Sequence, residues 1–228
     1  MNSNIILRAT QVEKSYVIEG SPLHALRKIN IDIEKDKITA IIGKSGAGKS
    51  TLLYILSGLL RPTNGSVYIN ERSFYGISDS DRSKIINECI GFVFQDYQLL
   101  SDFTVLENVF IPAFLRFGSR SKQYCIDKAT SLLKKMDLLD RKNHLPVQLS
   151  GGEQQRVAIL RSFINEPEII FCDEPTGNLD EENSKRLIDL ILEFNNNNSQ
   201  TFVLVSHDEK IKHISDKVFK LSAGALSE

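Results

Sequence analysis

The feature that most constrains the fold is a glycine-rich segment between an apolar run and a helical pattern. Residues 43–50 read Gly-Lys-Ser-Gly-Ala-Gly-Lys-Ser, which fits the pattern G-x-x-x-x-G-K-S. The apolar residues 38–42 before it predict a buried strand, and residues 51–60 after it have the apolar spacing of a helix. A strand, a glycine-rich turn and a helix in this order form the context in which this pattern binds phosphate.

The residue types in this segment suit a triphosphate. Glycines let backbone N–H groups curl around phosphate oxygens, and a helix N-terminus adds unpaired donors. Lys49 would place a positive charge on the β- and γ-phosphates, and Ser50 would offer its hydroxyl to Mg²⁺. A structural turn with an exposed lysine is the alternative. We expect the following residues to bind the nucleotide: Gly43, Lys44, Ser45, Gly46, Ala47, Gly48, Lys49, Ser50 and Thr51.

Composition limits the class of protein. The chain has 228 residues and a formal net charge of -1, which suits one domain and argues against a surface built to bind nucleic acid. Its three cysteines, Cys89, Cys125 and Cys172, form no C-x-x-C pair, so neither a zinc site nor a disulfide framework is expected. No apolar run reaches the ~18 residues that span a bilayer. We therefore expect a cytoplasmic chain, unless a partner holds it at a membrane.

Apolar runs that alternate with helical patterns predict an α/β fold with a largely parallel sheet and helices on both faces. Residues 96–160 lack such strands, and we interpret them as a helical sub-domain inserted into this core within one domain of residues 1–228. The asparagine run 195–198 is expected to be an exposed turn. The predicted strands are 5–7, 29–33, 38–42, 67–69, 90–94, 169–172, 202–205 and 218–221.

Two carboxylates follow the apolar run 169–172. The carboxyl ends of buried parallel strands are where ligands bind in such sheets. Because side chains alternate along a strand, Asp173 and Glu174 should point in different directions. We assign Asp173 to magnesium and Glu174 to general-base work on the attacking water. A solvated acidic turn is the alternative.

A second candidate anion site begins at Leu149-Ser150-Gly151-Gly152-Glu153. Ser150 and Glu153 fit the S-x-x-E capping box of a helix N-terminus, which is a purely structural explanation. That explanation leaves Gly151 and Gly152 unexplained, because glycine weakens a first helical turn. Two glycines would instead let a negative group approach the backbone donors.

These motifs together resemble the ABC ATPase family, over nearly the whole chain. Residues 149–153 resemble its LSGGQ signature, Gln95 its Q-loop glutamine, and His207 its switch histidine. Tyr16 stands where the family stacks an aromatic ring on adenine. Asn178, Leu179 and Asp180 resemble the D-loop. The resemblance also implies the fold, a P-loop core with an N-terminal antiparallel β part.

The resemblance implies a mechanism. Two subunits would sandwich two ATP molecules head to tail, so that Ser150, Gly151, Gly152 and Glu153 of one copy face the nucleotide of the other. Gln95 would touch magnesium and sense the helical sub-domain, and His207 would hold the γ-phosphate or the attacking water. The cofactors implied are ATP and Mg²⁺. The partners implied are a second ATPase subunit and a membrane permease that holds the chain at the cytoplasmic face of a bacterial inner membrane.

A narrower resemblance concerns one bacterial branch of lipoprotein-releasing, macrolide-exporting and cell-division ATPases. The resemblance lies in the sequences of residues 91–95, 99–109 and 175–180. Within them, Leu-Leu-Ser-Asp-Phe-Thr at residues 99–104 favours the lipoprotein-releasing members. Asp36 and Lys37 replace the usual glycine and glutamate, and residues 159–163 depart from an alanine-rich wording while keeping Arg161. The alternatives left open are an efflux ATPase, a nucleotide-gated scaffold, and a soluble ABC protein acting on ribosomes or DNA. The cargo and the choice between identical and different subunits are also open.

Overall fold

A computed structural model of the chain describes residues 4–18, 20–177 and 179–228. Its N-terminal part is an antiparallel sheet. Strand β1 (Ile5–Ile18) pairs with β2 (Ser21–Glu34) on one side and with β4 (Asn64–Ile69) on the other, and the short β5 (Arg72–Ser73) pairs with β4. The expected antiparallel part is therefore present, in the order β2-β1-β4-β5.

The second sheet has the order β10-β9-β3-β8-β7-β6. Its strands from β9 to β6 pair in parallel, and only β10 pairs antiparallel among the described pairings of this sheet. Parallel neighbours bring the carboxyl ends of β3, β7 and β8 to one edge, where the site lies. The strands are β3 (Ile38–Ile42), β6 (Ile90–Val93), β7 (Ile169–Asp173), β8 (Thr201–Ser206), β9 (Lys217–Ser222) and β10 (Ala225–Ser227).

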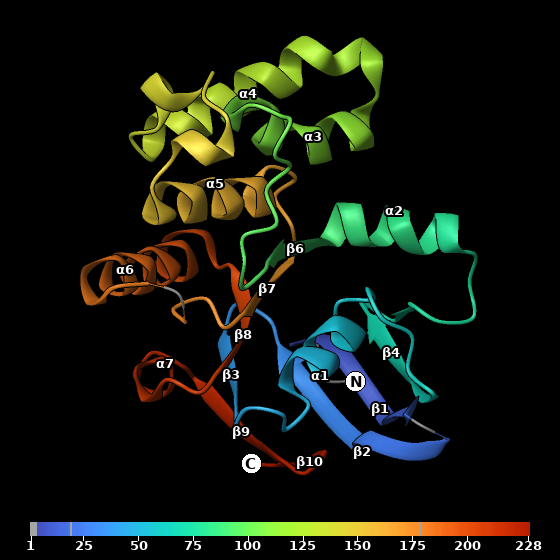
Figure 1. Cartoon of the computed structure of the whole chain (residues 1–228). Coiled ribbons are helices and arrows are strands. Elements are labelled where there is room, and N and C mark those ends of the chain that lie inside the picture. The colour runs from blue at the N-terminus through green and yellow to red at the C-terminus, as the bar shows by residue number, and fades with distance from the viewer. Residues whose placement is uncertain (1–3, 19, 178) are drawn as a thin grey trace.

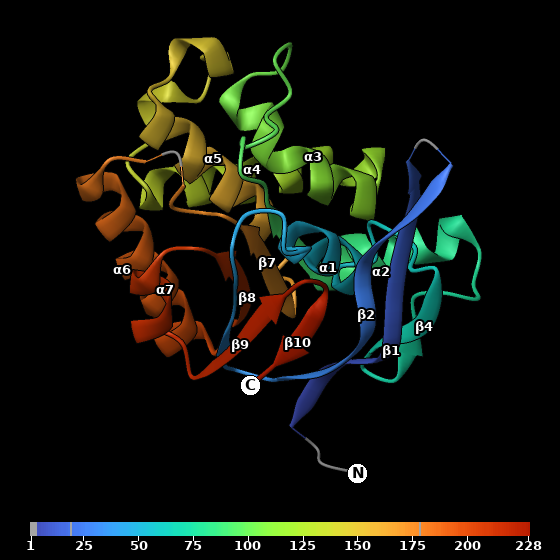
Figure 2. The same cartoon turned by 60° about the horizontal axis from the view of Figure 1, so that its bottom comes forward.

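Helices cover both faces of the parallel sheet, as Figures 1 and 2 show. Alternation along β7 explains how. Ile169 and Phe171 pack with α1 and the antiparallel sheet, whereas Ile170 and Cys172 pack with α5, α6 and α7. The helices are α1 (Lys49–Leu56), α2 (Asp79–Cys89), α3 (Val105–Phe117), α4 (Lys122–Lys135), α5 (Gly151–Phe163), α6 (Glu181–Asn198) and α7 (Glu209–His213).

Helices α3, α4 and α5 enclose a core cluster of their own, above the sheet in Figure 1. Val109 of α3, Leu133 of α4 and Leu160 of α5 are fully buried in it. Helix α5 also contributes Ile159 and Phe163 to the sheet core, so this helix joins the two parts. The boundaries of the inserted sub-domain, residues 96–160, stay a prediction.

The cysteines are buried inside the fold. Cys89, Cys125 and Cys172 are free thiols with no more than 7% of their surface exposed. Among the described residues, no helix is both long enough and apolar enough to cross a membrane.

Several predicted boundaries are wrong. The asparagine run 195–198 is helical rather than a turn, because α6 continues to Asn198 and ends at Ser199 in a left-handed conformation (φ 52°). Helix α1 begins at Lys49 and ends at Leu56, not at residues 51 and 60, since Ser57 caps it. Strands β1 and β2 extend far beyond the predicted runs 5–7 and 29–33, and α2, β5 and β10 were not predicted.

Candidate nucleotide site

A cavity of about 620 Å³ opens where the glycine-rich segment meets the ends of β7 and β8. Its volume lies in the range of about 300–1,000 Å³ that is usual for ligand pockets. It is lined by Tyr16, Leu23, Ala25, Lys44, Ser45, Gly46, Gly48, Lys49, Ser50, Thr51, Gln95, Glu174 and His207.

The glycines of residues 43–48 are required by the backbone. Gly46 and Gly48 adopt positive φ angles of 77° and 100°, a region that favours glycine. A Cβ atom on Gly43 would lie 2.4 Å from the carbonyl oxygen of Leu221, and one on Gly48 would lie 2.7 Å from that of Ala25. The loop therefore curls tightly between its neighbours, with Gly48 as the N-cap of α1.

Lys49 is buried at the start of α1, with 6% of its surface exposed. Its Nζ donates to the carbonyl oxygens of Gly43 and Lys44, at 3.0 and 3.3 Å. It also forms an ion pair with Oε1 of Glu174 at 3.1 Å. Because a buried ammonium group requires partners, these acceptors hold the charge of Lys49 beside the loop of residues 43–48.

Asp173 ends strand β7 next to the start of α1, where Ser50 Oγ donates to its Oδ1 at 2.9 Å. Burial raises the pKa of Asp173, and hydrogen bonds from Tyr54 and Ser50 oppose that rise. Burial also raises the pKa of Tyr54 to about 12, so this tyrosine stays protonated and donates. A hydroxyl and a carboxylate side by side are hard oxygen ligands of the kind that Mg²⁺ prefers.

Glu174 points elsewhere. It follows the last residue of β7 and has a positive φ of 44°, so the turn after the strand, and not the expected alternation along it, sets its direction. Its Oε2 accepts hydrogen bonds from the backbone N–H of His207 at 3.2 Å and lies 2.9 Å from His207 Nδ1. The Glu174 side chain is 11% exposed, whereas that of His207 is 68% exposed. The structure thus brings together Lys49, Glu174 and His207 from three separate parts of the chain.

Tyr16, Leu23 and Ala25 form the opposite wall, from paired strands β1 and β2. Lys14 Nζ lies 5.2 Å from the ring centroid of Tyr16, a cation–π distance. Gln95 also lines the cavity, two residues after the end of β6. Sequence reasoning missed Leu23, Ala25 and Tyr54; the helical spacing from Ser50 could have indicated Tyr54, one turn further along α1.

The turn at residues 150–153 lies outside this cavity, since none of its residues lines it. The capping box is confirmed, because Ser150 N–H donates to Glu153 Oε2 at 2.8 Å and Glu153 N–H to Ser150 Oγ at 3.3 Å. Gly152 has a packing reason as well, since a Cβ there would lie 2.7 Å from Asn183 Oδ1. A Cβ on Gly151 would have room, because its nearest neighbour, Tyr97 Oη, would lie 3.8 Å away.

Of the three D-loop residues, Asn178 lies outside the described residues. Asp180 is the N-cap of α6 and accepts a hydrogen bond from Asn183 N–H at 2.8 Å. That bond holds the pKa of Asp180 below its ordinary value. Leu179 packs partly buried against the sheet core.

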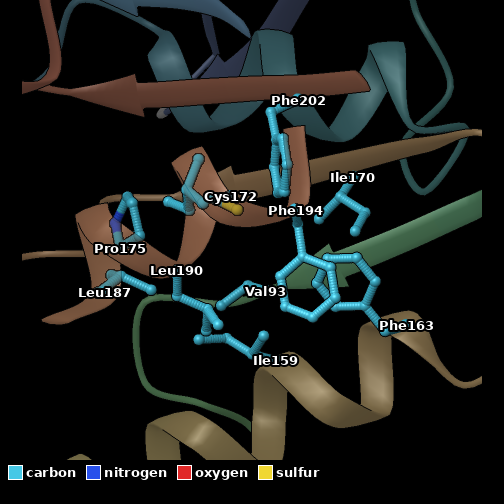
Figure 3. Close-up of a pocket in the computed structure, with 11 residues that line it drawn as sticks. Val93, Ile159, Phe163, Ile170, Cys172, Pro175, Leu187, Leu190, Phe194 and Phe202 are labelled. Carbon is cyan, nitrogen blue, oxygen red and sulfur yellow. The ribbon is translucent and has the colours of Figure 1, made fainter. Parts of the chain in front are cut away.

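An apolar gap under α5 and α6 is a feature of the core rather than a site. Figure 3 shows its lining side chains, with Phe163 and Phe194 stacked face to face at 4.0 Å between ring centroids. The gap measures about 10 Å³, close to the space of one water molecule. Among the described residues, no cluster of three His, Cys, Asp or Glu side chains could hold a metal ion.

Comparison with known proteins agrees with this geometry. A family model described as ABC transporter matches residues 26–177. The chain is 44% identical to the lipoprotein-releasing system ATP-binding protein LolD of Buchnera aphidicola subsp. Schizaphis graminum, over 99% of this chain and 98% of that protein. It is 40% identical to the protein of the same name from Saccharophagus degradans, with the same coverage.

Solved structures give the same result. The dimeric structure of MJ0796, a bacterial ABC transporter cassette, has a TM-score of 0.91 and 36% identity, and the match covers 97% of both chains. A post-hydrolysis state of that cassette bound to ADP and Pi has a TM-score of 0.90 and 35% identity, covering 97% of this chain and 98% of that one. The fold, the phosphate loop and these similarities place the chain in the ABC transporter family, as one of its ATP-binding and ATP-hydrolysing cassettes.

Proposed function

We propose that the chain powers a bacterial transporter that releases lipoproteins from the inner membrane, with a separate permease as its partner. The names of relatives at 40–44% identity support this cargo. The observation that carries the ATPase role is the convergence of Lys49, Glu174 and His207 on one cavity. The chain would lie at the cytoplasmic face of that membrane, held there by the permease.

The donor set fits Mg-ATP. Ser50 and Asp173 offer oxygen ligands for Mg²⁺, and Gln95 adds an amide oxygen at the same cavity. Bound Mg²⁺ would neutralise charge on the phosphate oxygens. The backbone of residues 43–50 would hold the phosphates, Lys49 would balance their charge, and Tyr16 would stack on adenine.

Glu174 suits the general base, and His207 suits its partner. Glu174 lies at the cavity wall with one carboxylate oxygen against Lys49 and the other against His207. In this position it would accept the proton of the attacking water. His207, largely exposed, would hold the water or the γ-phosphate.

A second identical copy would complete the site. Ser150, Gly151, Gly152 and Glu153 do not line the cavity of their own chain, yet they form a capped helix N-terminus of the kind that binds anions. The D-loop residues Asn178, Leu179 and Asp180 would lie along the same contact between copies. The similar cassette MJ0796 is dimeric, which supports a pair of copies.

Glu174→Gln tests this proposal. We expect ATP hydrolysis to fall by about a thousandfold, within the range of losses seen when a catalytic group is removed, while ATP binding persists and the variant forms a dimer with ATP. Rate assays and light scattering check these outcomes. Glu182→Gln, on exposed α6, is the matched control and should behave as the wild type.

The cargo needs its own experiment. Vesicles that contain the proposed partner permease and a labelled lipoprotein should release the label only with ATP and wild-type chain. Release of a macrolide instead, or stimulation of ATPase activity without any release, would assign the chain to the efflux or cell-division members. A Glu174→Gln variant that hydrolyses ATP at the wild-type rate would contradict the base assignment, whatever the cargo.

A further inference from the structure

Arg161 of α5 contacts the turn that follows Gln95. Its Nη1 donates to the carbonyl oxygen of Gln98 at 2.6 Å, and its Nη2 donates to that of Tyr97 at 2.7 Å. The guanidinium is therefore bound in a forked manner by two consecutive backbone groups. Within residues 4–18, 20–177 and 179–228, no carboxylate pairs with it.

The two residues that Arg161 binds have an unfavourable backbone. Tyr97 and Gln98 both adopt positive φ angles, 58° and 49°, although neither is glycine. L-residues reach this region at a cost and keep it only when their surroundings hold them there. Tyr97 N–H donates to Phe94 O at 3.1 Å and Gln98 N–H to Asp96 O at 2.6 Å, so the turn is also tight.

The same turn reaches the helix start at Ser150. The hydroxyl of Tyr97 lies 3.8 Å from the position that a Cβ on Gly151 would take. Helix α5 thus binds the turn through Arg161, three turns along the helix, and begins at Gly151 near the Tyr97 hydroxyl. Burial lowers the pKa of Arg161, but an arginine remains charged at neutral pH.

We propose that Arg161 is a positioning residue that sets the place of Gln95 in the nucleotide cavity, because it fixes the turn after Gln95 to the helix that begins at Ser150. The inference rests on the proposed function, in which Gln95 contacts Mg²⁺. If α5 moved, the hydrogen bonds from Arg161 to the carbonyl groups of Tyr97 and Gln98 would carry this turn with it. Gln95, which precedes the turn, would then move as well. The anion-binding turn and the magnesium ligand are in this way mechanically linked through one side chain.

The test is a double-mutant cycle. Arg161→Lys keeps the charge but loses the planar fork that reaches both carbonyl groups. We expect it to lower kcat about tenfold, on the scale of one charge-assisted hydrogen bond, and to raise the Mg²⁺ concentration that gives half the maximal rate. In the Gln95→Ala background it should lower kcat by less than about twofold, because the residue it acts through is gone.

Arg116→Lys is the matched control. Arg116 Nη1 also donates to a backbone carbonyl, that of Asn165, at 2.8 Å, and not to one in the turn after Gln95. Its effect on kcat should be the same in both backgrounds. If Arg161→Lys also has equal effects in both backgrounds, Arg161 is a merely structural residue and the inference is overturned.

Hydrogen exchange separates this inference from the proposed function. Arg161→Lys should speed amide exchange at Tyr97 and Gln98, and Arg116→Lys should leave it unchanged. Unchanged exchange in Arg161→Lys would overturn the positioning role even in an active ATPase. Faster exchange in a chain that hydrolyses no ATP would support the positioning contact and contradict the proposed function instead.

Discussion

Lys49 and Glu174 show how a single pair of residues shapes the site. The ammonium group of Lys49 is held by two carbonyl oxygens and by the carboxylate of Glu174 at 3.1 Å. Both side chains are nearly buried, so each charge depends on the other for compensation. A phosphate that enters the loop would compete with Glu174 for Lys49. Nucleotide binding would thereby release Glu174, the proposed base, from its ion pair with Lys49.

We predict that Lys49→Ala abolishes ATP binding. The variant removes the charge that would face the phosphates and also leaves Glu174 buried without its cation. Isothermal titration with ATP measures the change, and the loss should exceed about a hundredfold in Kd, the equivalent of a desolvated charge contact. Lys37→Ala, at the opposite end of β3, is the control, since Lys37 pairs with Asp216. Equal ATP affinity in Lys49→Ala and the wild type would refute the cradle assignment.

Individual residues also show where sequence reasoning is sufficient. The phosphate loop and the capping box follow from local rules, because each depends on neighbours a few residues away. Asp36 illustrates the limit. It adopts φ 61°, a conformation that favours glycine, with its N–H bonded to Thr201 Oγ1 at 2.9 Å. That partner is distant in sequence, so no local pattern could indicate it.

Among the elements, α3 has a complete capping box at its N-terminus. Thr104 Oγ1 accepts from Glu107 N–H at 3.3 Å, and Glu107 Oε2 accepts from Thr104 N–H at 2.8 Å. The hydrogen bond from the Thr104 backbone, the largest cause, holds the pKa of Glu107 below its ordinary value of 4.5. A folded-state pKa below the unfolded value stabilises the fold above pH 4.5, and this contribution is lost as the pH falls through the lowered pKa.

Glu107→Gln should therefore be less stable than the wild type at pH 7, by about 0.5–1 kcal/mol. The difference in free energy of unfolding should shrink toward zero as the pH falls below 4.5, because the wild-type carboxylate then becomes protonated. Urea unfolding at several pH values measures it. Glu193→Gln, at an exposed position of α6, should show no such trend. If the difference in free energy of unfolding stayed constant with pH, the charge of Glu107 would contribute nothing to the stability of the cap.

Elements that were missed from the sequence have few buried side chains. Helix α2 buries only Cys89 among its described residues, so no apolar stripe marked it. The outer part of β1 is stabilised by cross-strand pairs such as Lys14 with Leu26 and Tyr16 with Leu23, and not by an apolar run. Helix α6 extends through the asparagine run because Asn195 Nδ2 donates to Gln200 O at 2.8 Å. The apolar pattern therefore carried little signal for α2 and for the outer part of β1, and it could not indicate the hydrogen bond of Asn195 near the end of α6.

At the scale of the whole molecule, three buried clusters divide the chain. Two cover the faces of the parallel sheet, and the third lies between α3, α4 and α5. Helix α5 contributes to both the sheet and the helical cluster through opposite faces. This division supports the interpretation that the helical part can open or turn as a unit while the sheet stays intact.

We predict that Leu133→Ala loosens the helical part first. Leu133 is fully buried in the third cluster, and its truncation should cost about 2–5 kcal/mol. Hydrogen exchange should accelerate in α3 and α4 far more than in β3 and β8. Leu204→Ala, fully buried in β8, should by contrast accelerate exchange throughout. Uniform acceleration in Leu133→Ala would mean that the chain unfolds as one unit.

The burial of the cysteines has a practical consequence. Burial raises the pKa of Cys89 to about 11, and with Cys125 and Cys172 also enclosed, thiolates are scarce and unreachable at neutral pH. A new cysteine at Val147, which is 83% exposed close to Ser150, would be the thiol that a maleimide dye modifies. Fluorescence from two such dyes could then follow the approach of two copies in real time, with every native sulfur left in place.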